Sequence, residues 1–227
     1  MAQQFDKEIQ MVNSNSFWYW DSVIPKEECD KILNLYPDKW VDAKVHTDRI
    51  ERSRDFDRDI GHDINTRNSQ VIFFSDKWVF ELAYSFIKSA NEQAGWEYDI
   101  KSMENLQLTR YETEGFYGWH SDGPSDNFGK YDRPKDDLLN GLIRKLSITI
   151  LLNDDYEGGE FQFKFANEKM KGLDKVGHGL KTNTLTPPMK GTGSVIVFPS
   201  YQLHRVKPVT KGMRYSLVGW ACSPPFK

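Results

Sequence analysis

The sequence predicts a mainly β protein with flanking helices, built as a jelly-roll or cupin-like barrel. From Leu106 onward, short apolar runs with strand character are separated by turn residues. Such spacing is typical of antiparallel barrels and not of parallel sheets that alternate with helices. Gly158-Gly159 and Gly191-Thr192-Gly193 supply tight turns between runs. The six predicted strands are 106–111, 145–152, 159–165, 193–198, 204–209 and 214–221.

Helical patterns occur before the predicted barrel. Pro25 suits a first helical position, and apolar residues recur at helical spacing as far as Tyr36, so we expect a short amphipathic helix over 25–36. The run 70–74 has strand character. A second apolar pattern at helical spacing predicts a longer helix over 76–93, which should pack on a sheet.

A polar stretch separates the first helix from the next strand. Residues 42–69 are dense in Asp, Arg and His and lack apolar periodicity, which indicates a long surface loop. Closure of this loop over a substrate is a hypothesis that its length and position suggest. We expect residues 1–105 to form a helical support that packs on a barrel of residues 106–227, within one structural domain.

Composition excludes several classes of partner. Thirty basic and 33 acidic residues give a formal charge of -3, so nothing in the overall charge favours nucleic acid or anionic lipid. The first ten residues have no apolar core, and the aliphatic run 148–152 is too short to span a bilayer. Cys29 and Cys222 cannot form a disulfide framework. A cytoplasmic protein without membrane association is therefore expected.

Two histidines and an aspartate form the candidate metal site. His120-Ser121-Asp122 places an imidazole and a carboxylate two residues apart, so both side chains can point the same way from extended backbone. His204, brought from a neighbouring strand, would complete a facial triad. Three ligands on one face leave the other metal positions open, as an iron(II) centre needs when it binds a co-substrate and O₂ together.

Other histidines in the chain offer weaker alternatives. A lone His-x-Asp pair carries little information, because His46-Thr47-Asp48 has the same form. That pair lies within the charged loop, whereas His120 lies between two predicted strands, where a site is held more rigidly. His62 and His178 stand in polar or glycine-flanked stretches and are interpreted as solvated loop residues.

Arg214 distinguishes this pattern from a generic metal-binding barrel. Alternation along 214–220 places Arg214, Ser216, Val218 and Trp220 on one face of a strand. If that face looks into the barrel, Arg214 is a buried guanidinium that requires an anion. A dicarboxylate such as 2-oxoglutarate supplies one, since its 2-oxo acid end can chelate iron while its distal carboxylate pairs with the arginine. Ser216 could add a hydrogen bond. An arginine paired with a surface Asp or Glu is the alternative interpretation.

Taken in order, these motifs resemble the 2-oxoglutarate and iron(II) dioxygenases of the prolyl hydroxylase superfamily. The resemblance covers about residues 106–222, and the tail from Gly193 to Trp220 is most similar to the PKHD-type hydroxylases. The motifs that carry it are Arg110-Tyr111, His120-Ser121-Asp122, Leu146-Ser147-Ile148-Thr149, Tyr156-Glu157-Gly158-Gly159-Glu160, Phe198-Pro199-Ser200 and the segment from His204 to Arg214.

The resemblance implies a double-stranded β-helix with iron(II) on His120, Asp122 and His204. It also implies 2-oxoglutarate on Arg214, with Tyr111 as a hydrogen-bonding partner of the co-substrate. O₂ is the expected second substrate, and ascorbate is a candidate further cofactor.

The substrate pocket is also inferred from the resemblance. Tyr117 and Trp220 are placed like aromatic residues of the pocket wall, although simple barrel packing would explain them equally well. Some prolyl hydroxylases place a tyrosine on the central strand near the distal carboxylate, where this sequence has Leu151. Thr149, on the same face, is the proposed substitute.

The expected activity is hydroxylation of a C–H bond coupled to decarboxylation of 2-oxoglutarate. A prolyl residue in a peptide or protein is the leading substrate, by resemblance alone. A free amino acid or small molecule is the alternative substrate, and a barrel that binds metal or ligand without turnover is the alternative of another class. A nucleic-acid dealkylating oxygenase would need a basic groove with stacking aromatics. The sequence does not determine the oligomeric state.

Overall fold

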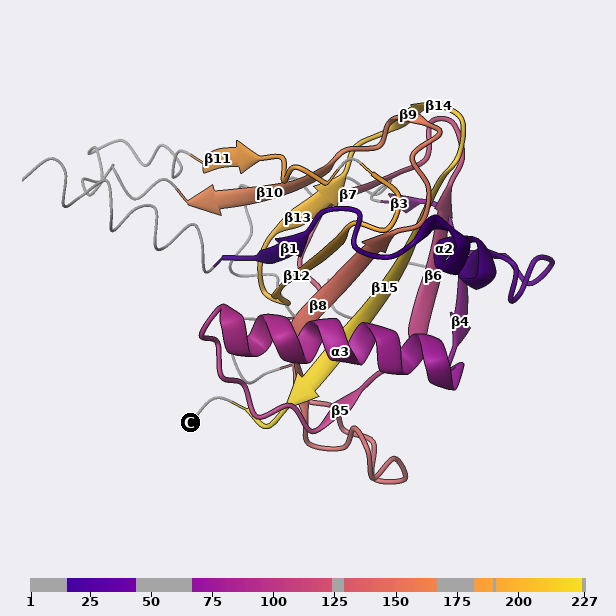
Figure 1. Cartoon of the computed structure of the whole chain (residues 1–227). Helices are drawn as coiled ribbons and strands as arrows, with labels where there is room; N and C mark the ends of the chain where they lie inside the picture. Colours follow the sequence, from indigo (N-terminus) through magenta and orange to yellow (C-terminus); the bar gives the residue numbers. More distant parts are fainter. Residues whose placement is uncertain (1–15, 44–66, 124–128, 167–181, 190, 226–227) are drawn as a thin grey trace, which may run out of the picture.

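The computed structural model describes residues 16–43, 67–123, 129–166, 182–189 and 191–225. Within these ranges the chain forms two facing antiparallel sheets, a two-stranded ribbon and helices on one side (Figure 1). This arrangement confirms the predicted mainly β architecture with flanking helices.

The larger sheet contains eight strands among the described residues. β8 and β15 form its centre, and β5 pairs with the far end of β15. Strands from the first 105 residues join both edges, because β1 pairs with β12 and β4 pairs with β6. Its order is β1 (Trp18–Trp20), β12 (Val195–Pro199), β8 (Ile143–Leu151), β15 (Arg214–Ser223), β6 (Leu106–Tyr111), β4 (Gln70–Phe74) and β2 (Val41–Asp42), with β5 (Ser102–Met103) off this path.

The smaller sheet lies opposite. In the described part of the chain it has five strands in the order β11 (Thr182–Leu185), β10 (Phe161–Ala166), β13 (His204–Val206), β7 (Phe116–His120) and β3 (Arg67–Asn68). A separate ribbon pairs β14 (Val209–Lys211) with β9 (Glu157–Gly158).

Register assigns each side chain of the larger sheet to one of its two faces. Arg214 lies opposite Tyr111 on β6, and Ser216 lies opposite Leu151 on β8. Cross-strand partners share a face, so the face that carries Arg214 also carries Tyr111 and Leu151. Tyr111 packs in one apolar cluster with Phe161 of the smaller sheet, so this face looks into the space between the sheets.

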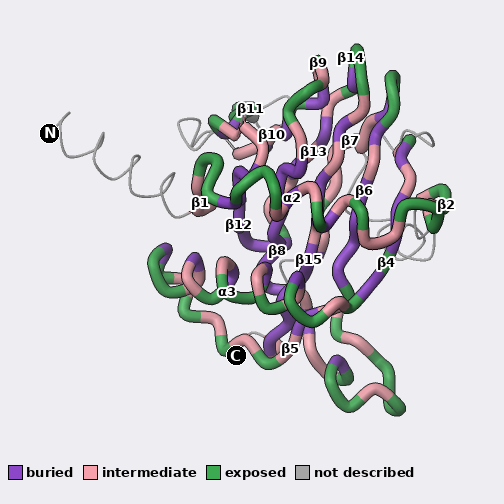
Figure 2. Tube along the Cα trace, turned by 45° about the vertical axis from the view of Figure 1, so that its right-hand side comes forward, coloured by how far each residue is buried: buried purple, intermediate pink, exposed green. Residues whose placement is uncertain are grey.

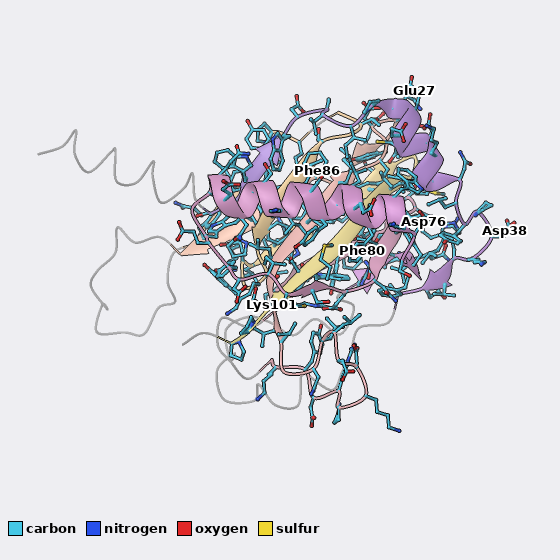
Figure 3. The ribbon with its side chains drawn as sticks, turned by 60° about the horizontal axis from the view of Figure 1, so that its bottom comes forward. Glu27, Asp38, Asp76, Phe80, Phe86 and Lys101 are labelled. Atoms are coloured by element: carbon cyan, nitrogen blue, oxygen red, sulfur yellow. The ribbon has the colours of Figure 1, made fainter. Side chains whose placement is uncertain are left out.

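The opposite face of the larger sheet is apolar and is covered by helix. α3 (Lys77–Gln93) buries Val79, Ala83, Ile87 and Ala90, a spacing that places them on one side of a helix. Full burial of side chains of the size of Val79 and Ile87 contributes about 1.5–3 kcal/mol each. Figure 3 shows α3 lying across the sheet, and two residues of this helix, Phe80 and Phe86, are partly buried and pack against the same core. The short α2 (Lys26–Leu33) adds Cys29 and Ile32 to the same core.

Burial follows this layered plan. Figure 2 shows the buried residues concentrated along the central strands of the larger sheet, with exposed residues on loops and on the outer sides of the helices. The central strand β8 is buried along almost its whole length. A strand with two covered faces is a rigid base for a functional site.

Several elements differ from the sequence-based expectation, among them the short strands β1, β2, β3, β5 and β11, which were not predicted. The first helix ends at Leu33 and not at residue 36. The single strand expected over 204–209 is divided into β13 and β14, with Pro208, which has no N–H to donate, between them. β7 was not predicted as a strand, since its glycine and mixed aromatic residues do not alternate. Most of the expected 42–69 loop, with its proposed closure, lies outside the described residues.

Gly193 provides a test of how the N-terminal segment is joined to the sheet. It has φ +81°, and its carbonyl accepts hydrogen bonds from the N–H groups of Val23 and Ile24. A Cβ at this position would overlap the backbone carbonyl of Ile24. Gly193→Ala should therefore lower the free energy of unfolding by at least about 3 kcal/mol.

Gly95→Ala is the matched control for that measurement. Gly95 also has positive φ, +69°, but a Cβ there would meet nothing within 4 Å. Backbone strain alone should lower the free energy of unfolding by about 1–2 kcal/mol. Equal urea unfolding midpoints for the two variants would contradict the close approach at Gly193.

Candidate metal centre

Two histidines meet across neighbouring strands of the smaller sheet. His120 is the last residue of β7 and His204 is the first residue of β13, and the two are direct partners in the antiparallel register. Their ring centroids lie 4.2 Å apart. Because cross-strand partners project from the same face, both imidazoles point into the space between the two sheets.

Asp122 is fixed beside them by its backbone. The chain turns after β7, and the N–H groups of Asp122 and Gly123 both donate to the Ser200 carbonyl at 2.9 Å. The Ser147 hydroxyl donates to the Asp122 carboxylate, and it also contacts the Ser200 hydroxyl at 3.0 Å. The Asp122 carboxylate is therefore held from β8, and its backbone is held from the turn after β12.

The separations among these three side chains fit a metal-binding triad. His120 Nε2 lies 3.7 Å from Asp122 Oδ1, and His204 Nε2 lies 3.6 Å from Asp122 Oδ2. One ligand atom from each residue lies within 4.8 Å of the others. Ligands each about 2.0–2.2 Å from one ion are separated by distances of this order. Two histidines and one carboxylate form the donor set of facial-triad iron centres.

Both imidazoles are oriented in the same way. The Nδ1–H of His120 donates to the Gly118 carbonyl and that of His204 donates to the Gln202 carbonyl, each at 2.8 Å. A carbonyl only accepts, so these contacts fix the proton on Nδ1 and leave the Nε2 lone pair free to bind a metal. In each case the acceptor lies two residues before the histidine.

The local electrostatics keep this donor set ready at neutral pH. Burial and the neighbouring His204 lower the pKa of His120 to about 3, so its ring is neutral. Burial alone would raise the pKa of Asp122, but His204, His120 and Arg144 together hold that pKa below its usual value. A neutral imidazole and an ionised carboxylate are the forms that bind a metal.

A partly buried charged network lies behind Asp122, and sequence reasoning missed it. The Arg144 guanidinium pairs with Glu104 and donates to the Asp122 backbone carbonyl at 3.1 Å. The Tyr131 hydroxyl also donates to Glu104. Arg144 lies over the Trp220 ring at 4.1 Å. Burial opposes the charge of Arg144, but the hydrogen bonds that it donates to Glu104 raise its pKa, so the arginine stays charged.

Aromatic side chains enclose the triad. Phe161 and Phe198 contact His204 with centroid distances of 5.4 and 4.8 Å. Tyr117 stacks on His120, with a centroid distance of 3.5 Å and an interplanar angle of 14°. Both phenylalanines were absent from the sequence-based site, because apolar strand residues give no signal beyond core packing. They limit the access of water to one side of the centre.

Arg214 lies on the opposite sheet with a buried, incompletely satisfied guanidinium. The residue is 1% exposed, and it is the largest of the fully buried side chains. It donates from Nη1 to Ser216 Oγ at 3.1 Å, while Nε has no hydrogen-bond partner. No Asp or Glu among the described residues lies within salt-bridge distance of it, so the surface-pair interpretation does not hold there. A buried arginine in this state requires an anion.

Close neighbours shape the space around Arg214. Tyr111 lies with its ring centroid 5.5 Å from the guanidinium carbon. Gly159, at φ +64°, leaves room for the arginine, because a Cβ there would come within 2.9 Å of Arg214 Cδ. Thr149 is buried on the same face, but the structure gives it no contact with the guanidinium. Leu151 is the cross-strand partner of Ser216.

The remaining sequence candidates fall into two groups. Trp220 is 6% exposed on the inner face, and its indole Nε1 has no hydrogen-bond partner among the described residues. His46, Asp48, His62 and His178 lie outside the described residues.

The barrel residues match the model of a known protein family. Residues 106–222 match the model of the 2OG-Fe(II) oxygenase superfamily. A PKHD-type hydroxylase of Idiomarina loihiensis is 31% identical over 125 residues, 54% of this chain and 44% of the relative. A PKHD-type hydroxylase of Synechococcus sp. (strain CC9902) is 33% identical over 123 residues, 53% and 42% of the two chains. The chain thus spans less than half the length of these curated relatives.

Solved structures share the fold at low sequence identity. A viral collagen prolyl hydroxylase from Paramecium bursaria Chlorella virus-1, in complex with 2OG, has a TM-score of 0.57 at 18% identity, covering 93% of this chain and 98% of that one. A prolyl hydroxylase from Trichoplax adhaerens, in complex with a peptide of hypoxia inducible factor, has a TM-score of 0.57 at 15% identity, covering 97% and 93%. Both support the double-stranded β-helix. In the described parts of this chain, no helix has the length and apolar character to cross a membrane.

Asp122→Asn tests the metal centre directly. The amide removes the one negative charge of the triad, so the affinity for Co(II) in calorimetric titration should fall by at least about 100-fold. Asp42→Asn, at an exposed position on β2, is the control and should leave the affinity unaltered. Equal Co(II) affinity in wild type and Asp122→Asn would exclude this cluster as the metal site.

Proposed function

Because the chain belongs to the 2OG-Fe(II) oxygenase superfamily, we propose that it is a dioxygenase that hydroxylates a C–H bond with iron(II), 2-oxoglutarate and O₂. His120, Asp122 and His204 are the proposed iron ligands, and Arg214 is the proposed partner of the co-substrate. The observation that carries the proposal is a metal-binding triad and a buried guanidinium without an acidic partner, both directed into one space between the sheets.

The residues fit both groups by their chemistry. Two Nε2 atoms and a carboxylate converge from one side, so the remaining positions around an iron ion stay open for co-substrate and O₂. Arg214 Nε has its hydrogen-bonding capacity unused, which a distal carboxylate would satisfy. A bidentate pair in this dry environment would fix the co-substrate with its other end toward the metal.

Each protein group then has a defined task. Iron(II) with bound 2-oxoglutarate supplies the oxidising chemistry, which consumes O₂ and releases succinate and CO₂. The Nδ1 hydrogen bonds of His120 and His204 hold both rings in the metal-binding tautomer. Phe161 and Phe198 keep water from the centre.

Three more residues are proposed for the co-substrate. Ser216 shares the Arg214 guanidinium, so its hydroxyl is placed to contact the same carboxylate. Tyr111, beside Arg214 on the neighbouring strand, is the proposed hydroxyl donor to the co-substrate. Thr149 is the third proposed residue, as a substitute from the same face for the tyrosine that some prolyl hydroxylases have where this chain has Leu151.

The proposed substrate is a prolyl residue in a peptide or protein. The names of the curated relatives and the solved prolyl hydroxylases support it. Tyr117 and Trp220 are the proposed pocket walls, since one stacks on His120 and the other lies against Arg144 near Asp122. A free amino acid or a small molecule is the alternative substrate, and ascorbate is included as a further cofactor.

The wider setting follows the same proposal. Residues 1–105 would support the catalytic barrel of residues 106–227, since β1, β2 and β4 extend its larger sheet. A cytoplasmic location accords with Cys29 and Cys222, which are both buried and unpaired. The formal charge of -3 gives no support to a nucleic-acid substrate.

Anaerobic titration with iron(II) and 2-oxoglutarate tests the proposed cofactor site. Wild-type protein should develop the visible charge-transfer band of the iron and 2-oxoglutarate chelate. Arg214→Met should raise the apparent Kd for 2-oxoglutarate by about 10- to 100-fold, because it removes a charge-assisted, bidentate contact. Arg214→Lys keeps the charge without the planar donor pair, so its Kd for 2-oxoglutarate should lie between those of the wild-type protein and Arg214→Met.

Arg133→Met is the control for an arginine outside the site, since Arg133 pairs with Asp136 at the surface. Absence of the band in folded wild-type protein would refute the oxygenase proposal. A normal band without succinate formation in air, with or without prolyl peptides, would instead favour the non-catalytic binding barrel.

A further inference from the structure

Arg67 places a second guanidinium near the metal centre, on the smaller sheet, whereas Arg214 lies on the larger one. It lies on the edge strand β3 and is the cross-strand partner of Tyr117 on β7. Its guanidinium carbon lies 4.5 Å from the centroid of the Tyr117 ring. His120 already covers one face of that ring at 3.5 Å, so Arg67 occupies the other face. The cation is thus one aromatic ring away from a proposed iron ligand.

This guanidinium is only partly satisfied. Nε donates to Ser69 Oγ at 2.7 Å, which fixes the plane of the group. Nη2 is buried and has no hydrogen-bond partner, and no carboxylate of the described residues lies within salt-bridge distance. A buried donor on a cation is costly unless an acceptor occupies it. The unused donor indicates a binding position for an external acceptor.

Other arginines of the chain differ from Arg67 because their guanidinium groups have acidic partners. Arg110, Arg133 and Arg144 each have an acidic partner within the chain. In the described ranges, buried guanidinium nitrogens without partners occur at Arg67 and Arg214. Arg214 is already assigned to the anion of the co-substrate, on the opposite sheet. Arg67 therefore remains for a different anion.

We propose that Arg67 binds a carboxylate of the primary substrate and so sets substrate specificity. This inference rests on the proposed function, because it concerns the molecule that is oxidised at the same metal centre. Stacking on Tyr117 presents the planar fork of donors in a fixed orientation, which suits bidentate recognition of a carboxylate. The carboxylate can belong to a free amino acid or to an acidic side chain of a peptide.

The position of Arg67 suits a substrate and not the co-substrate. Arg214 reaches the space between the sheets from β15, whereas Arg67 comes from β3 at the edge of the smaller sheet. A molecule held at Arg67 would lie along Tyr117 and reach the triad from the His120 side. Tyr117 would then act as the wall between the substrate anion and the metal, as proposed for it above.

Binding of small carboxylates tests the inference without requiring turnover. The protein, loaded with Zn(II) and 2-oxoglutarate, is titrated with N-acetyl-L-proline, free L-proline and acetyl-prolyl-glutamic acid amide. The matched neutral probes are N-acetyl-L-prolinamide, L-prolinamide and acetyl-prolyl-glutamine amide. The arginine side-chain N–H signals are followed by NMR, with the Arg67 signals assigned from Arg67→Met.

At least one carboxylate should shift the Arg67 signals saturably, whereas its amide should not. Arg67→Met should weaken binding of that carboxylate by about tenfold or more, because a charge-assisted hydrogen bond is lost. The identity of the probe that binds shows whether the substrate carboxylate belongs to a free amino acid or to an acidic side chain of a peptide. Arg110→Met is the matched control, since Arg110 also donates to a neighbouring side chain and lies over an aromatic ring. The Arg110→Met variant should bind the same carboxylate with the affinity of the wild-type protein.

Two results would overturn the inference. One is the absence of a saturable shift of the Arg67 signals with all three carboxylates up to the solubility of the probes. The other is equal carboxylate affinity in wild type and Arg67→Met. The charge-transfer band, measured in parallel on iron-loaded protein, separates these results from failure of the proposed function. A wild-type band together with either result removes only the assignment of Arg67.

Discussion

The direct pairing of His120 with His204 across β7 and β13 is the constraint on which the site depends. Antiparallel register brings two imidazoles from distant parts of the chain to one point, and a one-residue slip would turn one of them to the other face. Asp122 joins them because its backbone is hydrogen bonded to Ser200 just beyond β12. The triad is therefore a product of sheet register together with one turn, and both are supported by the covered central strand β8.

The distribution of charged partners distinguishes the Asp122 carboxylate of the protein from the two proposed sites for external carboxylates, at Arg214 and Arg67. The acidic ligand Asp122 is stabilised by His120, by His204 and by Arg144, whose own charge is balanced by Glu104. Arg214 and Arg67 have no such acidic partner among the described residues. Cations that are balanced within the chain stabilise the structure, whereas cations left incomplete favour binding of an anion. This contrast separates the supporting network behind Asp122 from the two proposed carboxylate sites.

Much of the barrel could be predicted from the sequence, because its central strands are apolar and its turns contain glycine. The face of β15 that carries Arg214 follows from simple alternation. β7 and β3 could not be predicted in this way, since Gly118 and mixed polar and aromatic residues hide their period. The Arg144 and Glu104 pair joins residues 40 apart, and the Arg67 stack depends on pairing of β3 with β7. Such contacts exist only once the sheets have formed.

The proposed iron site at the triad and the proposed co-substrate site at Arg214 face one space between the sheets. A crystal structure of the protein prepared anaerobically with iron(II) and 2-oxoglutarate would test both assignments most directly. The account predicts iron bonded to Nε2 of His120, the Asp122 carboxylate and Nε2 of His204, with the distal carboxylate about 2.7–2.9 Å from the Arg214 nitrogens. Iron bound by other residues, or a co-substrate whose distal carboxylate has no contact with Arg214, would contradict it.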